Sequence, residues 1–199
     1  MKKVTSIFLT LTFVFSLMLP VHADSVPYDD PYSSNFSEDI LIDGELYSFK
    51  YSLTSSGERM TIVSDSNGHT DVVRTNDSGT EIYLNDILSA STQSNSLGSS
   101  LVSSGDGWST PVAHKQYISW LEGASVGTVA AVVGTAMGAP VSLVIVGCGA
   151  FYGFCAGGTL YWETQYNIDN GFDPKLKTTW SFTASTKDVY GPYSFIITR

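Results

Sequence analysis

Two hydrophobic patterns divide the chain. Between about residues 40 and 85 apolar and polar residues alternate, and in Glu45–Leu53 the side chains on one side are all apolar. Alternation with a period of two is typical of a half-buried antiparallel strand. Turn sequences ending in Gly68 and Gly79 separate further runs of this kind, and Asn67-Gly68 is favoured in tight hairpins. The pattern predicts a small antiparallel β-meander within a β-rich region, residues 24–89.

The second pattern is an uncharged run. Gly123 to Trp162 holds forty residues without an Asp, Glu, Lys, Arg or His. Proline suits the first turn of a helix and displaces the preceding residue from helical geometry, so we expect two helices, 123–139 and 140–162, hinged at Pro140. Residues 114–122 have apolar side chains at helical spacing and are expected to lead into this pair as a helix. Residues 114–167 are thus predicted to form a hydrophobic, glycine-rich helical hairpin.

Glycines and aromatic residues give this hairpin its candidate membrane features. Glycines spaced four apart line a helix face with bare backbone and permit close helix contact in lipid. The helix-packing candidates, which also offer a route to self-association, are Gly123, Gly127, Gly134, Gly138, Gly149, Gly153 and Gly157. Tryptophan and tyrosine favour the membrane–water interface. The residues expected to gather at one interface are Tyr117, Trp120, Tyr161 and Trp162.

Two further segments complete the predicted organisation. Residues 90–113 are dominated by Ser, Gly, Thr and Asn, a composition typical of a flexible linker. Residues 168–199 regain strand character and are predicted to form a C-terminal β-hairpin that returns to the N-terminal sheet. The predicted fold class is α+β: a small antiparallel β-meander, a glycine-rich hydrophobic helical hairpin and a C-terminal β-hairpin.

The first 23 residues have the plan of a secretory signal peptide. Lys2 and Lys3 precede an apolar run, Val4–Leu19, and the small residue Ala23 marks the expected cleavage site. An uncleaved anchor is the alternative, but the run is short for a span of about 20 residues. We therefore expect a protein that is secreted or resides in the cell envelope.

Charge narrows the range of partners. Without residues 1–23 the chain has eight basic and nineteen acidic residues, a formal net charge of −11. Such acidity repels phosphate backbones and anionic lipid headgroups. It argues against nucleic acid as a partner, and it also opposes electrostatic capture by a bacterial membrane.

Enzymatic motifs are weak. Gly123–Gly127 matches Gly-x-Ser-x-Gly, but that motif requires a strand before it and a histidine later in the chain. Both histidines outside the leader, His69 and His114, precede Ser125. We expect no catalytic residues, and a serine hydrolase using Ser125 is the minority hypothesis.

Metal and cofactor motifs are equally weak. Asp65–Asp71 begins like a calcium loop, but Gly68 stands fourth rather than sixth. A plain hairpin is therefore favoured, with weak calcium binding by Asp65 and Asp71 as the alternative. No zinc spacing or phosphate-binding loop is present in the sequence, so we expect neither a metal nor a cofactor.

The two cysteines pose a geometric question. In an exported chain Cys148 and Cys155 are expected to form a disulfide. Seven residues of helix rise about 10.5 Å, whereas a disulfide needs Cα atoms within about 7 Å. A bond therefore requires the helix to break between them. The alternative is two small apolar helix residues with free thiols, and the disulfide is the favoured of the two.

The apolar segment also resembles known toxins. Cys148 to Cys155, followed by Gly157, Gly158 and Tyr161, resembles the cysteine-bracketed peptide of the sporulation-delaying cannibalism toxin. The predicted helix pair resembles the hydrophobic hairpin that pore-forming colicins insert. The resemblance is compositional, and the chain departs from it in cysteine spacing and acidic charge.

This resemblance implies a bacteriocin- or toxin-like exported protein that inserts a hydrophobic helical hairpin into a lipid bilayer. The alternative is a secreted or cell-surface β-rich structural or binding protein, in which the hairpin is a buried core or a membrane anchor.

Overall fold

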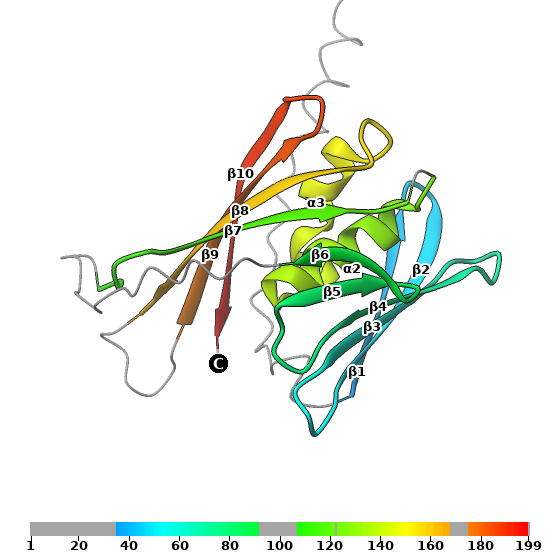
Figure 1. Cartoon of the computed structure of the whole chain (residues 1–199), viewed down its shortest axis with the longest axis horizontal. Coiled ribbons are helices and arrows are strands. Elements are labelled where there is room, and N and C mark those ends of the chain that lie inside the picture. The colour runs from blue at the N-terminus through cyan, green and yellow to red at the C-terminus, as the bar shows by residue number, and fades with distance from the viewer. Residues whose placement is uncertain (1–34, 92–106, 122, 168–174, 199) are drawn as a thin grey trace, which may run out of the picture.

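The computed structural model describes residues 35–91, 107–121, 123–167 and 175–198. In this part of the chain, ten strands form one antiparallel sheet in which each strand pairs with the next in sequence (Figure 1). The strands are β1 (Phe36–Ile42), β2 (Glu45–Leu53), β3 (Arg59–Ser64), β4 (Thr70–Thr75), β5 (Glu81–Leu84), β6 (Ile87–Ser91), β7 (Val112–Ser119), β8 (Gly157–Tyr166), β9 (Lys175–Ala184) and β10 (Val189–Thr198).

Two helices connect β7 to β8. They are α2 (Val126–Met137) and α3 (Val141–Phe151), and they lie between the two halves of the sheet (Figure 1). Helix α2 packs on β3, β4 and β5, whereas α3 packs on α2 and β10. The class is α+β, as predicted, but the sheet dominates, and the predicted meander and C-terminal hairpin are parts of the same sheet.

Alternation in the sequence gives the sheet its inner and outer faces. In β2 the side chains of Tyr47, Phe49 and Tyr51 are buried against the helices, while their neighbours in sequence point outward. Strand β9 alternates in the same way along its whole length. Each strand thereby presents one apolar row to a shared core, as expected for a sheet that is covered on one face.

Two helical predictions are wrong. Residues 114–122 were expected to be helical, but Val112–Ser119 is strand β7, paired with β6 and β8. The second helix was expected to reach residue 162, but α3 ends at Phe151 and residues 157–162 open strand β8. The apolar spacing in these stretches suits either period, and the long pairing of β7 with β8 decides it. Of the predicted linker 90–113, residues 92–106 lie outside the described residues.

The two helices are delimited by recognisable caps. Ser125 precedes α2, and its hydroxyl oxygen accepts a hydrogen bond from the backbone N–H of Thr128 at 3.0 Å. Gly138 ends α2 in the left-handed conformation, with φ of 66°. Pro140 is the N-cap of α3, at the position where the hinge was predicted. The chain therefore reverses within Gly138–Pro140.

Some of the predicted glycines let a helix approach a neighbouring group, whereas Gly123, Gly149 and Gly153 have no such neighbour. A Cβ on Gly127 would lie 2.6 Å from the ring of Tyr47 on β2. A Cβ on Gly134 would meet the carbonyl oxygen of Ala139 at 2.7 Å, at the turn into α3. Gly149 and Gly153 face open space, and Gly157 lies in β8. The glycine row expected along the second helix does not form, because α3 ends at Phe151.

Gly147, which is not among the predicted helix-packing glycines, makes the closest approach of either helix to a neighbouring side chain. A Cβ on Gly147 would lie 2.3 Å from the ring of Trp180, which is buried on β9. The rings of Phe151 and Phe182 stack nearby with centroids 4.2 Å apart, and Trp120 packs on both. Helix α3 therefore packs on the C-terminal half of the sheet through the backbone at Gly147 and through aromatic rings.

Substitution of Gly147 tests the packing of α3 on Trp180. We expect Gly147→Ala to lower the free energy of unfolding by about 1–3 kcal/mol, because the added methyl group overpacks a core in which Trp180 is held on all sides. Gly149→Ala is the matched control on the same helix, and we expect it to raise stability by about 1 kcal/mol through helix propensity. Urea unfolding of the three proteins measures both values. Equal effects of the two substitutions would contradict the packing described.

Candidate functional site

The outer face of α3 is exposed and carries no charge. Positions spaced three and four apart form one exposed stripe: Ser142, Val146, Gly149, Ala150 and Gly153. Val146 is 81% exposed, and Phe154, in the turn after the helix, is 68% exposed. We call Val146, Ala150 and Phe154 the α3 apolar face. Because this face points away from the packed side of the helix, its large apolar side chains contact solvent. Exposed apolar patches of this kind often mark an interaction surface.

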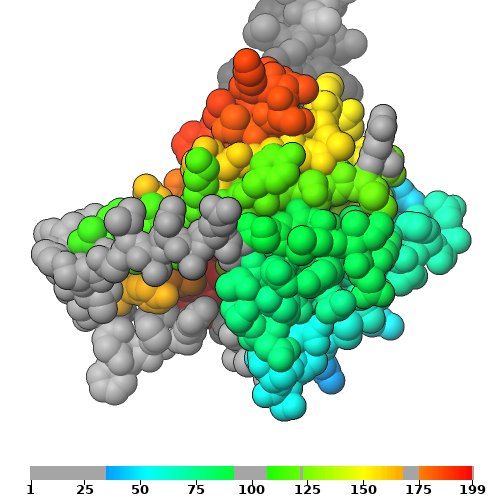
Figure 2. All heavy atoms as spheres, viewed as in Figure 1, coloured from blue at the N-terminus to red at the C-terminus, as the bar shows by residue number. Residues whose placement is uncertain are grey.

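The end of β7 borders the α3 apolar face. The backbone N–H of Trp120 donates to the carbonyl oxygen of Ala156 at 3.1 Å, and its indole N–H donates to Cys155 O at 2.9 Å. Leu121, which follows, is an exposed leucine beside the turn that carries Phe154. In the space-filling view, the yellow end of α3 lies at the surface next to the red turn between β9 and β10 (Figure 2).

The exposed face of α3 cannot be identified from the residues of the helix alone. Helix α3 reads Val-Ser-Leu-Val-Ile-Val-Gly-Cys-Gly-Ala-Phe, with apolar or small residues on every side. Its glycines were therefore predicted as contact residues, but Val146 and Phe154 were not. By contrast, Val141, Val144 and Phe151 of the same helix are fully buried.

A buried carboxylate anchors the start of α2 to the sheet. Asp71 of β4 accepts a hydrogen bond from the hydroxyl of Thr128 at 2.5 Å and another from the side-chain amide of Asn85 at 2.7 Å. The ring nitrogen Nε2 of His69 lies 3.3 Å from Asp71 Oδ1. A negative charge beside a helix N-terminus is also favoured by the helix dipole. These contacts fix the first turn of α2 against β4.

Strand β1 anchors the start of α3 in a similar way. Glu38 accepts hydrogen bonds from the hydroxyl of Tyr51 and, at 3.2 Å, from the backbone N–H of Ser142. The N–H of Val141 donates to the Tyr51 hydroxyl oxygen at 2.8 Å. The N-cap residue Pro140 makes no side-chain cap, so these two sheet residues satisfy helix donors in its place.

Three of the four aromatic residues predicted at one interface lie on the adjacent strands β7 and β8, Trp120 directly follows β7, and the four face two ways. Tyr117 of β7 and Tyr161 of β8 are exposed on the outer face of the sheet. Trp162 and Trp120 are buried on the inner side, where Trp162 stacks on His114 with ring centroids 4.9 Å apart. Trp120 lies opposite Ala156, six residues before Trp162, so the four do not gather at one place, and the pleat also separates the tyrosines from the tryptophans.

The cysteines lie on either side of the end of α3, and both thiols are free in the structure. Cys148 is fully buried within the helix, and burial raises the pKa of its thiol. Cys155 is partly exposed after the turn, with Sγ 3.9 Å from the carbonyl oxygen of Phe151. The helix does end between them, as a bond would require, and the disulfide stays a prediction.

The minority hypothesis of a serine hydrolase draws little support from the position of Ser125. Its hydroxyl accepts the cap hydrogen bond of α2 and lies 2.8 Å from the hydroxyl of Thr128. His69 interacts with Asp71, and His114 stacks on Trp162. The serine and the two imidazoles are therefore committed to separate structural contacts.

The suggested calcium ligands also have other partners. Asp65 Oδ1 accepts the backbone N–H groups of Asn67 and His69 at 2.9 and 2.8 Å, which closes the β3–β4 turn. Asp71 instead points to α2. Within the described ranges no three His, Cys, Asp or Glu side chains are grouped to hold a metal ion.

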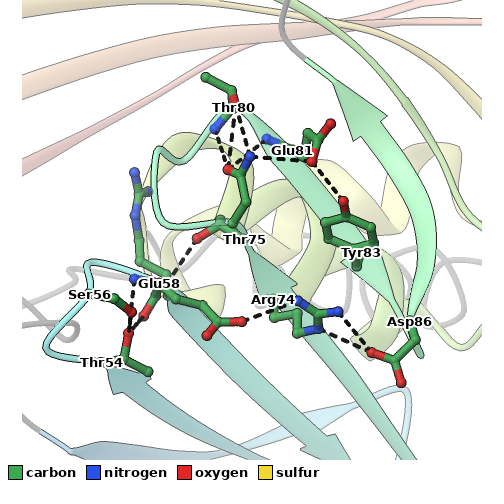
Figure 3. Close-up of polar contacts among 11 residues, drawn as sticks. Thr54, Ser56, Glu58, Arg74, Thr75, Thr80, Glu81, Tyr83 and Asp86 are labelled. Carbon is green, nitrogen blue, oxygen red and sulfur yellow. Dashed lines mark hydrogen bonds and ion pairs between the residues drawn. The ribbon is translucent and has the colours of Figure 1, made fainter.

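Arg74 forms the centre of a polar cluster on the outer face of β3–β6 (Figure 3). Its guanidinium lies 3.3 Å from Glu58 and 3.1 Å from Asp86, and it stacks over the ring of Tyr83 at 4.6 Å. The hydrogen bond with Asp86 is the main cause of a raised pKa for Arg74. The tyrosine hydroxyl in turn donates to Glu81 at 2.7 Å. The charged groups of the cluster pair with one another across neighbouring strands and turns and so reinforce strand pairing.

None of the helices in the described residues is long and apolar enough to cross a membrane.

Replacing Asp71 tests the anchor of α2. We expect Asp71→Ala to lower the free energy of unfolding by about 3 kcal/mol, because it removes a buried carboxylate that accepts charge-assisted hydrogen bonds from Thr128 and Asn85. Asp77→Ala, in the exposed turn between β4 and β5, serves as the control and should change stability by less than about 0.5 kcal/mol. Thermal and urea unfolding followed by circular dichroism distinguish the two; a similarly small effect at Asp71 would show that the anchor is unimportant.

Alkylation tests the state of the cysteines. In the native protein without reductant, iodoacetamide should modify Cys155 first, because Cys148 is buried and its thiol is held in the protonated form. Cys148 should react only after unfolding, and peptide mass spectrometry identifies each modified residue. Protection of both residues until a reductant is added would instead demonstrate the disulfide.

Comparison of the chain with protein-family models, curated proteins and solved structures gave no match.

Proposed function

We propose that the chain is an exported membrane-active protein, secreted or held in the cell envelope, whose helix pair makes the contact with a lipid bilayer. The α3 apolar face carries this proposal. Its exposed valine and phenylalanine belong to forty residues without a formal charge, Gly123 to Trp162. An apolar helix face exposed to water gains free energy when it is transferred to the acyl boundary of a membrane.

Helix length favours a first contact along the membrane surface. Helices α2 and α3 have 12 and 11 residues. At about 1.5 Å per residue each is roughly 18 Å long or less, well short of a hydrocarbon core of about 30 Å. In the folded protein α3 would therefore lie in the interface, with Val146 and Phe154 directed toward the acyl chains.

Toxin-like insertion would follow by release of the pair from the sheet. Glycines with positive φ stand at both junctions, Gly123 at 84° and Gly153 at 80°, and they give these junctions backbone conformations that other residues rarely adopt. The contacts that must break include Glu38 with α3 and Asp71 with α2. Until then the sheet covers α2 and keeps the uncharged pair soluble.

The acidity of the chain bears on the type of lipid. With a net charge of −11 after removal of residues 1–23, the protein gains nothing from anionic headgroups. Apolar contact is then the driving force, so vesicles of phosphatidylcholine should bind the protein at least as well as vesicles that contain phosphatidylglycerol.

The burial of α2 favours a second candidate. Ten consecutive residues, Val126–Thr135, are buried. A secreted or cell-surface β-rich structural or binding protein would use the helix pair in this way, as a permanent core or an anchor. Such a protein would bind neither type of vesicle and would leave its contents intact.

Vesicle flotation and dye release test the proposal. Mature protein should float with phosphatidylcholine vesicles and release an entrapped dye. Val146→Asp should reduce both by at least tenfold, because a carboxylate at the contact opposes transfer into lipid. Val189→Asp is the matched control: it is also an exposed valine, at 68%, but lies at the start of β10.

Two outcomes would contradict the proposal. If the wild-type protein neither floats nor releases dye, the buried-core candidate is favoured. If both substitutions reduce binding equally, the contact does not lie on α3.

A further inference from the structure

The sheet ends in two edge strands. In the part of the chain that the structure describes, β1 pairs only with β2 and β10 only with β9. The outer edge of each strand therefore presents a row of backbone N–H and C=O groups, to which another strand can add. Both edges are long: β1 has 7 residues and β10 has 10.

The edge of β10 is regular over its C-terminal part, where a further strand could pair. Its irregularity is confined to the step between Tyr190 and Tyr193, which contains the cis Gly191-Pro192 bond. From Tyr193 to Thr198 the register with β9 is continuous. Ile196 is 54% exposed on the outer face, and on β1 Leu41 is 69% exposed on the same face of the sheet. Large apolar side chains on edge strands favour association over solubility.

Charge is distributed unequally between the two ends of the sheet. The described residues of β1–β6 and their turns, 35–91, hold ten acidic and three basic residues, a net charge of −7. Residues 92–199 hold six acidic and five basic residues, a net charge of −1. Two N-terminal ends therefore repel each other, whereas the N-terminal end of one molecule meets little repulsion at the C-terminal end of another.

Side chains near the two edges complement one another. Asp39 and Leu41 project from the outer face of β1. On the other edge, Ile196 pairs with Lys177 of β9, and Thr198 pairs with Lys175. An antiparallel register that places Leu41 opposite Ile196 also places Asp39 opposite Thr198, beside Lys175. Apolar groups then meet apolar groups, and a carboxylate lies near an ammonium group.

We propose that a second copy of this chain docks through β-strand addition, with the β1 edge of one molecule on the β10 edge of the next. The two surfaces differ, so the contact is head to tail and repeats, which gives a closed ring or a filament. This proposal does not rest on membrane activity and stands or falls separately from it.

Cysteine cross-linking tests the contact. The parent is the mature chain with Cys148→Ala and Cys155→Ser, which lacks the native thiols. Leu41→Cys and Ile196→Cys are introduced into it together, and the parent itself is measured alongside. Mild oxidation should give a ladder of multimers for the double variant. Leu46→Cys with Ile196→Cys is the matched control, because Leu46 is exposed on the same face at 51% but lies one strand inside the edge.

Sedimentation without cross-linking provides a second measurement. The wild-type chain should sediment as multimers at micromolar concentration and dissociate toward monomers on dilution. Leu41→Lys should abolish the multimers, because it brings a second cation toward Lys177, whereas Leu46→Lys should retain them. Circular dichroism verifies that both variants are folded.

Three results would overturn the proposal. The first is a monomer at all concentrations with no ladder. The second is a monomeric, internally cross-linked double variant, which would mean that β1 and β10 meet within one molecule. The third is cross-linking of Leu41→Cys alone to dimers as efficiently as the double variant forms multimers, which would replace the head-to-tail contact by a symmetric one.

Discussion

Close packing between the helix pair and the inner face of the sheet sets the geometry of the molecule. Where an ordinary residue would hold a helix away from its neighbours, Gly127 lets α2 rest on the ring of Tyr47 and Gly147 lets α3 rest on Trp180. These two contacts bring one helix onto the N-terminal half of the sheet and the other onto the C-terminal half. Because α2 and α3 also pack on each other, the pair joins the two halves around one core.

Polar contacts complement that packing. The first turns of α2 and α3 receive carboxylate contacts from Asp71 and Glu38, on strands at different places in the sheet. A hydrophobic helix has few means of fixing its own rotation, because its sides are chemically alike. The directional hydrogen bonds at its N-terminus fix the rotation of the helix about its axis. They explain why one face of α3 is turned outward although no charge in its own sequence requires it.

Local sequence was sufficient for some of these features and insufficient for others. Alternation in Glu45–Leu53 and the turn at Asn67-Gly68 predict strands and a hairpin that the structure contains, because these signals depend on near neighbours. Strand β7 was misassigned because its apolar residues fit both a helical and a strand period, and its partner β8 comes only after the two helices in the sequence.

Pro140 marked the division between helices, but nothing near Phe151 signalled where α3 would end. The exposure of Val146 depends on Trp180 and β10, which are distant in sequence, so the candidate contact face could not be predicted from α3 itself.

The connectivity of the sheet has a consequence for how the protein reaches its folded state. Every strand pairs with its predecessor, so β1 to β6 can form in order as the chain emerges, each requiring only a short loop to close, and β7 then adds after the twenty residues 92–111. The uncharged helices then appear before the strands that cover them on the other side, β8 to β10. For that interval their apolar surface has only half of its eventual cover, and aggregation competes with completion of the sheet. Arrival of the C-terminal strands, rather than formation of the helices, is the step that commits the chain to its native structure.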